Sequence, residues 1–126
     1  MEDLFDKIKR AHSDESDEFY TEERCHILEL YNSAEDRTHS IARARVEPGV
    51  TTAWHRLINT QETILVLSGE GQLELIEEHI YPLSKGTVVK IPEDCPQRVV
   101  NTADEDLIFL CFCLPAFGDQ CYEDLE

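Results

Sequence analysis

Cationic residues are scarce in this sequence. It contains 11 Lys and Arg residues against 27 Asp and Glu residues, which gives a formal net charge of −16 at pH 7. A surface with this excess of negative charge repels both the phosphate backbone of nucleic acids and anionic membranes. We therefore expect no nucleic-acid partner and no membrane partner. The acidity is typical either of adaptation to high salt or of a well-hydrated soluble surface, and composition does not separate these two explanations.

Long hydrophobic runs are also missing. The N-terminal stretch MEDLFDKIKR has no apolar region after its charges, unlike a secretory signal. No segment approaches the roughly 18 consecutive apolar residues that a membrane-spanning helix needs. From these absences we expect a cytoplasmic protein.

The cysteines form neither a C-x-x-C pair nor an even-numbered set, because the chain has five of them. This pattern argues against a disulfide framework and against a common zinc knuckle. The one close pair, Cys111 and Cys113, lies in the apolar stretch LIFLCFCLP. Alternation along a strand places both thiols on one face, where we interpret them as small buried residues.

The chain does contain many short β-type runs separated by turn residues. A length of 126 residues with 41% hydrophobic content is enough for one core, so we expect one domain. The candidate strands are CHILELY, HSIARARV, TTAWHRL, ETILVLSG, QLELI, HIYPL, TVVKIP, QRVVN and LIFLCFCL. Such runs without intervening helical patterns predict an all-β antiparallel sandwich or barrel.

The first 24 residues differ from the rest in being strongly charged. Leu4, Phe5 and Ile8 share one helical stripe, which predicts a short amphipathic N-terminal helix that covers part of the body. The acidic run SDESDE that follows is typical of a solvated loop. We therefore separate an acidic N-terminal segment (1–24) from a barrel domain (25–114) and a C-terminal tail (115–126).

Two polar residues interrupt the apolar alternation of neighbouring predicted strands. His55 shares a face with Leu57, and Glu62 shares a face with Ile64 and Val66. If both faces point inward, His55 and Glu62 meet, and an imidazole with a carboxylate suits a divalent metal such as Zn, Fe, Mn or Ni. A hydrogen-bonded or exposed pair is the alternative.

The glycines and prolines around these strands follow two spaced patterns. Gly49, His55, Glu62 and Gly69 fall on a motif of glycine, five residues, His-x-His, three or four residues, glutamate, six residues and glycine, with Leu57 in place of the second histidine. A second motif has glycine, five residues, Pro-x-Gly, two residues, histidine, three residues and asparagine. Gly86, Pro92 and Asn101 fall on it, with Asp94 for the second glycine and Gln97 for the histidine. In both motifs the sequence resembles the cupin superfamily.

The resemblance implies a cupin-type double-stranded β-helix, or jelly-roll, barrel over residues 25–114. It also implies one metal ion inside the barrel, and here the ligands would be His55, Glu62 and Gln97. Leu57, Ile64 and Val99 would form the pocket wall. Gln97 offers a neutral amide oxygen and Leu57 offers only carbon, so this ligand set is depleted. Three protein ligands and water still make an open catalytic site, whereas Leu57 fits equally well in an apolar cavity without metal.

Three hypotheses about function follow. The first is a metal-dependent cupin enzyme that acts on a small polar metabolite. The second is a non-catalytic cupin that binds a small molecule in a metal-free, partly apolar barrel. The third is a structural or regulatory homodimer without a ligand. Small cupins similar to this one commonly pair sheet to sheet, so the resemblance also implies a homodimer.

The remaining polar residues of the motif region have simpler interpretations. In the run IARARV, small residues fit the interior of a narrow barrel, so we expect Arg43 and Arg45 outside. The opposite register would turn an arginine inward as an anchor for a carboxylate or a phosphate. We expect Asn101 to fix a turn.

Overall fold

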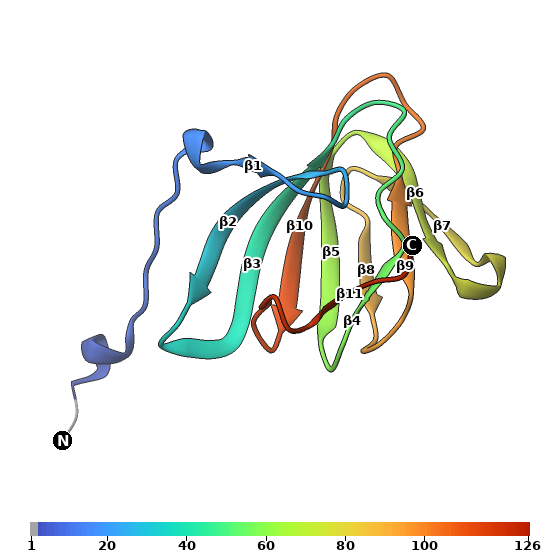
Figure 1. Cartoon of the computed structure of the whole chain (residues 1–126). Helices are drawn as coiled ribbons and strands as arrows, with labels where there is room; N and C mark the ends of the chain where they lie inside the picture. The colour runs from blue at the N-terminus through green and yellow to red at the C-terminus, as the bar shows by residue number, and fades with distance from the viewer. Residues whose placement is uncertain (1–2) are drawn as a thin grey trace.

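Two antiparallel sheets form the body of the protein, whose computed structural model describes residues 3–126. One sheet has six strands in the order β1-β2-β3-β10-β5-β8, and the other has five in the order β11-β4-β9-β6-β7 (Figure 1). The strands are β1 (Phe19–Tyr20), β2 (His26–Ser33), β3 (Asp36–Val46), β4 (His55–Leu57), β5 (Gln61–Ser68), β6 (Glu70–Leu75), β7 (Ile80–Ser84), β8 (Val88–Ile91), β9 (Gln97–Val100), β10 (Leu107–Leu114) and β11 (Tyr122–Asp124). The prediction of an all-β barrel made of two antiparallel sheets is confirmed.

All nine predicted runs contain a strand, and two further strands lie outside the range 25–114. β1 pairs with β2, and β11 pairs with β4 along Tyr122↔Leu57 and Asp124↔His55. Both additional strands are two or three residues long. Their sequences lack the apolar alternation that a longer strand needs, so their formation depends on the edge strand that each one joins.

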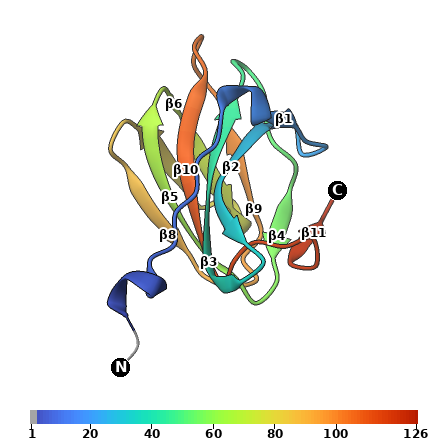
Figure 2. The same cartoon turned by 90° about the vertical axis from the view of Figure 1, so that its left-hand side faces the viewer.

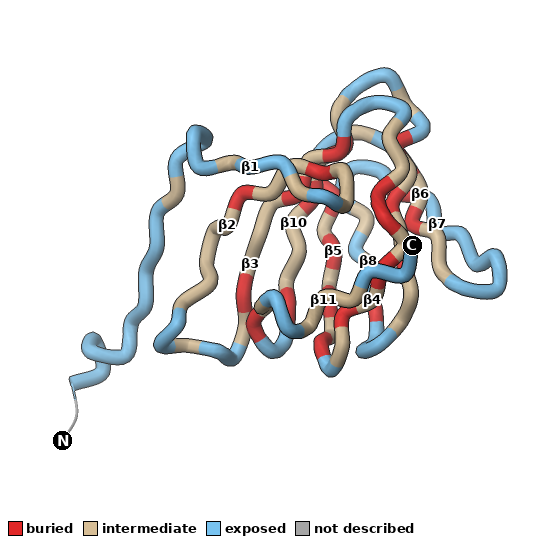
Figure 3. The backbone as a smooth tube through the Cα atoms, viewed as in Figure 1, coloured by how far each residue is buried: buried red, intermediate tan, exposed pale blue. Residues whose placement is uncertain are grey.

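The core lies between the two sheets, where the inward residues of opposite strands meet. Its fully buried members include Ile64 of β5, Leu73 of β6 and Leu107 of β10. Figure 3 shows buried residues alternating with more exposed ones along these strands, as expected for strands with one face inside. Gly69 connects β5 to β6 at φ +89°, and a Cβ atom there would collide with the Asp106 carbonyl oxygen, so the close approach of these loops requires glycine.

The prediction of an amphipathic N-terminal helix is wrong in its extent. Residues Leu4–Lys7 form one 3₁₀ turn, and the chain returns to an extended conformation at Ile8. Leu4 is 74%, Phe5 75% and Ile8 64% exposed, so the stripe covers nothing. Figure 1 shows this segment away from the sheets. A single turn without a packing surface does not repay the cost of helix nucleation. Within residues 3–126 no helix is long and apolar enough to cross a membrane.

Strand β3 divides its residues between the cavity and the outside as predicted. Ala42 and Ala44 face the interior, and Ala44 is 2% exposed. Arg43 and Arg45 bind the carboxylate of Glu18 on the other side of the sheet, with an Arg43 Nη2–Glu18 Oε2 distance of 2.9 Å. The interior of the barrel therefore receives methyl groups from this strand and no guanidinium group.

Two residues of the second motif, Asp94 and Asn101, shape the turns beside the strands. Asp94 stands where the motif has glycine, and its φ of 64° lies in the left-handed region that aspartate tolerates better than most residues. Asn101 is buried, donates to the carbonyls of Val46 and Glu105, and accepts from the amide of Ala103. The prediction that Asn101 fixes a turn is confirmed.

Candidate functional site

A cavity of about 570 Å³ opens between the two sheets. His55 of β4, Glu62 of β5 and Gln97 of β9 all line it, together with Leu57, Ile64 and Val99. His55 and Gln97 are paired across β4 and β9, and Glu62 pairs with Cys113 of β10 and with Ile91 of β8. The sites predicted from the two motifs are therefore neighbours in space, and whether they hold a ligand stays a prediction.

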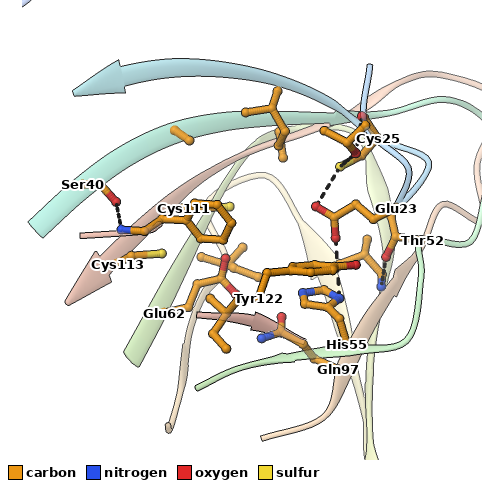
Figure 4. Close-up of a pocket in the computed structure, with 18 of the residues that line it drawn as sticks. Glu23, Cys25, Ser40, Thr52, His55, Glu62, Gln97, Cys111, Cys113 and Tyr122 are labelled. Carbon is orange, nitrogen blue, oxygen red and sulfur yellow. Dashed lines mark hydrogen bonds and ion pairs between the residues drawn. The ribbon is translucent and has the colours of Figure 1, made fainter. Parts of the chain in front are cut away.

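The ring of His55 is held from three sides. Its Nδ1 atom lies 2.9 Å from the carbonyl oxygen of Ala53 and 3.5 Å from Oε2 of Glu23. The ring stacks on Tyr122, with centroids 5.0 Å apart and planes 19° from parallel (Figure 4). Because both neighbours of Nδ1 are acceptors, we assign the proton to Nδ1 in the neutral ring. Nε2 then carries a free lone pair, and no residue in the described part of the chain donates to it.

Glu62 is a buried carboxyl without a full set of partners. Its residue is 9% exposed, and its Oε1 atom has no hydrogen-bond partner among residues 3–126. Burial raises the pKa of Glu62, and the charge of Glu23 raises it further. His55, the Cys111 thiol and the Gln97 amide act in the opposite direction and favour the ionised carboxylate. The carboxyl thus holds a proton to a higher pH than an exposed glutamate does.

Among the many lining residues outside the motifs, Glu23, Cys25 and Tyr122 form contacts around His55. Glu23 belongs to the loop between β1 and β2, where its backbone carbonyl accepts from the amide of Ala53 at 3.0 Å. Its carboxylate also accepts from the thiol of Cys25 at 3.3 Å. Tyr122 comes from β11, near the C-terminus of the chain. No spacing pattern in the sequence points to these residues, because the segments that carry them reach the cavity only through tertiary pairing.

The thiols of the predicted close pair also face this cavity. Cys111 and Cys113 are free cysteines on one face of β10, and both line the site. Burial raises the pKa of each thiol, and the charge of Glu62 adds to the effect. Thiols in this state are poor nucleophiles, so the geometry supports the interpretation of both cysteines as small, inert wall residues.

The residues present do not fit the full four-ligand metal set that the cupin resemblance implies. His55 and Glu62 are good metal ligands. Leu57, however, takes the place of one histidine of the motif, and Gln97 takes the place of another with a neutral amide. No group of three or more His, Cys, Asp or Glu residues within positions 3–126 is arranged to hold a metal ion. Catalytic zinc sites usually have three strong protein ligands, so we derive no chemical step through a metal.

Comparison with known proteins agrees with the fold. Residues 42–113 match the cupin domain family. An uncharacterized protein of Methanocaldococcus jannaschii is 28% identical over 122 residues, which cover 95% of this chain and 97% of that protein.

Solved structures give the same result. An uncharacterized Klebsiella pneumoniae protein with a double-stranded β-helix domain superimposes with a TM-score of 0.75 at 18% identity and covers 94% of this chain and 99% of its own. Pac13, a nucleoside dehydratase of Streptomyces, superimposes with a TM-score of 0.76 at 14% identity, covering 94% and 92%. At these identities the likeness shows the fold alone. The family match covers more than half of the chain, and this protein therefore belongs to the cupin domain family.

Proposed function

We propose that this cupin binds a small polar metabolite in its barrel cavity and exchanges protons with it through His55 and Glu62. The observation that carries the proposal is the orientation of two proton-exchanging groups toward one cavity. The Nδ1 atom of His55 is held by Ala53 and Glu23, which leaves Nε2 available. Glu62 Oε1 is buried and has no partner within residues 3–126. An unsatisfied buried oxygen beside a cavity is costly unless a ligand completes its hydrogen bonds.

The two groups have different tasks in this proposal. His55 accepts a proton on Nε2, and the carboxylate of Glu23, 3.5 Å from Nδ1, stabilises the resulting imidazolium. Glu62 supplies or removes a second proton, because burial raises its pKa above the ordinary value for glutamate. The fold shared with Pac13, which acts on nucleosides, is consistent with a small-molecule ligand and does not identify it.

A thermal-shift screen with polar metabolites tests the proposal. We expect at least one compound to raise the melting temperature of the native chain and to lose this effect in Ala42→Phe, which places a ring in the cavity. Ala34→Phe is the matched control, because Ala34 is exposed in the turn between β2 and β3. If a compound stabilises the native chain and Ala42→Phe equally, it binds elsewhere, and a screen with no stabilising compound contradicts the proposal.

A divalent metal held by His55, Glu62 and Gln97 is the second candidate. The unpaired Glu62 oxygen favours this candidate too, because a metal cation would bind that oxygen in place of a hydrogen-bond donor. Elemental analysis of protein purified without a chelator separates the two candidates. A stoichiometric Zn, Fe, Mn or Ni content that His55→Ala removes would replace the metal-free proposal. The double variant Leu57→His, Gln97→His should then bind that metal more tightly than the native chain does.

We also infer that two copies pair through the outer face of the six-stranded sheet. Alternation on β3, β5 and β10 turns Ile41, Leu65 and Leu110 away from the cavity, and Val88 is 60% exposed beside them. Figure 2 shows the N-terminal segment crossing in front of this sheet, and Leu4 and Phe5 of that segment are exposed. A second copy would cover both apolar features at once. Light scattering should give twice 14.5 kDa at tens of micromolar, and a monomer mass would refute the pairing.

A further inference from the structure

All ionised side chains that line the cavity, apart from His55, are acidic. The described lining contains no lysine and no arginine. The acidic members, from five different segments, are Glu22, Glu23, Glu29, Glu62, Asp119 and Asp124. Charges that surround a cavity with low-dielectric walls focus their field inside it, so the potential there is negative.

The nearby arginines are held away from this lining. Arg24 lies in sequence between Glu23 and Cys25, which both face the cavity. Its backbone adopts a left-handed φ of 72°, and its guanidinium binds the Thr51 carbonyl at 2.8 Å and the Glu126 carboxylate at 3.0 Å. Arg37 likewise donates to the carbonyls of Ser33 and Phe117. These two guanidinium groups are used in structural contacts, and within residues 3–126 neither forms a hydrogen bond or ion pair with a carboxylate of the lining, although the charge of Arg37 lowers the pKa of Glu29 from a distance.

The unpaired oxygen of Glu62 is a second observation, independent of the charge of the lining, that points to a ligand. More than nine-tenths of its surface is buried, it lines the cavity, and its Oε1 atom is without a hydrogen-bond partner in the part of the chain described. Figure 4 shows Glu62 near the His55–Tyr122 pair, with Glu23 on the far side of that pair. In its ionised form Glu62 has oxygens that only accept, so the group that completes Oε1 is then a donor, and a cationic donor favours this ionised form.

Aromatic rings complete the lining. Phe19, Phe109, Phe117 and Tyr122 contribute to the same cavity. Aromatic faces attract cations, and carboxylates combined with aromatic rings are a known means of binding organic ammonium groups. Phosphate and carboxylate ligands would face acidic groups with no arginine or lysine among the described lining residues to pair with them.

We propose that the ligand of this cavity is a small organic cation, an amine whose ammonium group pairs with Glu62, in the negative field to which Glu23 contributes, while its carbon skeleton packs on the aromatic wall. This inference rests on the proposed function, because it names the class of ligand for the same site. The volume of about 570 Å³ suits a metabolite of modest size. Anionic metabolites are excluded by the charge of the lining.

Matched probes that differ only in charge test the inference by isothermal titration calorimetry. Tyramine is the cation, tyrosol its neutral analogue and 4-hydroxyphenylacetate its anion, and putrescine, 1,4-butanediol and succinate form an aliphatic set. We expect at least one amine to bind tenfold more tightly than its neutral analogue, with no binding of either anion. Binding of an anion as tight as that of its amine overturns the inference, as does failure of both amines to bind at millimolar concentration.

Charge-neutral variants locate the effect. Glu62→Gln should weaken binding of the amine at least fivefold more than binding of its neutral analogue, and Glu23→Gln should do so to a smaller degree. Glu35→Gln is the control, because it removes the same charge from an exposed turn outside the cavity. An equal loss in all three variants would mean that net charge alone attracts the amine, and would refute the cavity assignment. If only neutral probes bind, and Ala42→Phe abolishes their binding, the small-molecule site stands and the cationic specificity fails.

Discussion

Two groups of carboxylates in this protein have opposite surroundings. We call the first the outer ion-pair cluster, and it consists of Glu15, Glu18, Arg43, Arg45 and Asp106 on the outside of the six-stranded sheet. We call the second the cavity carboxylates, and it consists of Glu23, Glu29 and Glu62, the three acidic lining residues that are not exposed. Each carboxylate of the outer cluster contacts an arginine, whereas the hydrogen-bond and ion-pair partners of the cavity carboxylates among residues 3–126 include no arginine or lysine.

The pKa values follow this difference. Hydrogen bonds first from Arg45 and then from Arg43 outweigh the effect of burial and lower the pKa of Glu18 to about 2. Burial raises the pKa of Glu62, and also that of Glu29, where an Asn32 hydrogen bond and the more distant charge of Arg37 oppose it only in part. The comparison shows that acidity serves two purposes here. Paired carboxylates stabilise the fold, and unpaired ones impose a folding cost that a ligand would offset.

The largest expected effect comes from breaking the outer ion-pair cluster at its centre. Glu18→Gln keeps the shape of the side chain but removes the charge that Arg43 and Arg45 share. Charge-assisted hydrogen bonds to partly buried arginines are strong, so we expect a loss of about 2 kcal/mol in the free energy of unfolding. Urea denaturation near neutral pH measures it. An unchanged unfolding midpoint would show that the cluster does not stabilise the fold.

The same substitution in the cavity should have the opposite sign. Glu62→Gln replaces a buried carboxyl, which has one unpaired oxygen and whose charge is costly, with a neutral amide of similar size. We expect the ligand-free protein to gain about 1 kcal/mol in stability at neutral pH. The matched pair of variants, measured in one buffer, is the direct test of the comparison. A loss similar to that of Glu18→Gln would mean that Glu62 is structural and that the cavity is not built for a ligand.

The pH dependence should separate the two groups further. The pKa of Glu18 is lowered from 4.5 to about 2 in the folded protein, so its stabilisation is present above pH 4.5 and is lost as the pH falls toward 2. The pKa of Glu62 is raised, so its cost is absent below pH 4.5 and grows as the pH rises through the folded value. Unfolding at about pH 3, 4.5 and 7 should therefore show Glu62→Gln approaching the native stability on acidification before Glu18→Gln does. Convergence of both variants in one pH range would contradict the assignment.

The barrel could be predicted well because strand alternation and motif spacing are visible in short stretches of the sequence. Alternation gave every strand longer than three residues, and motif spacing brought His55, Glu62 and Gln97 to one cavity. Glu23 and Tyr122 were missed, because Glu23 lies in a loop after the two-residue strand β1 and Tyr122 in the three-residue strand β11, and neither segment has a periodic signal of its own. The N-terminal stripe was overinterpreted, because periodicity reports which residues could share a face and not whether a surface exists to cover it. The acidic character of the cavity could be recognised only in the folded structure, since its acidic residues come from separate segments of the chain.

The smallest expected effect lies at the edge of the outer ion-pair cluster. Asp106 is 37% exposed and lies 3.2 Å from Nη1 of Arg45, whose remaining contacts are to the more buried Glu18. Exposed ion pairs gain little, because water screens them and the side chains lose freedom in forming them. Asp106→Asn should therefore lower the free energy of unfolding by only about 0.3 kcal/mol, against the larger loss for Glu18→Gln, in the same urea titration. Raising the salt concentration should abolish the Asp106 effect while leaving most of the Glu18 effect, since buried pairs are screened less. If Asp106→Asn and Glu18→Gln lowered the free energy of unfolding equally, the strength of these ion pairs would not depend on their exposure. The stabilisation would then be shared evenly among the members of the cluster.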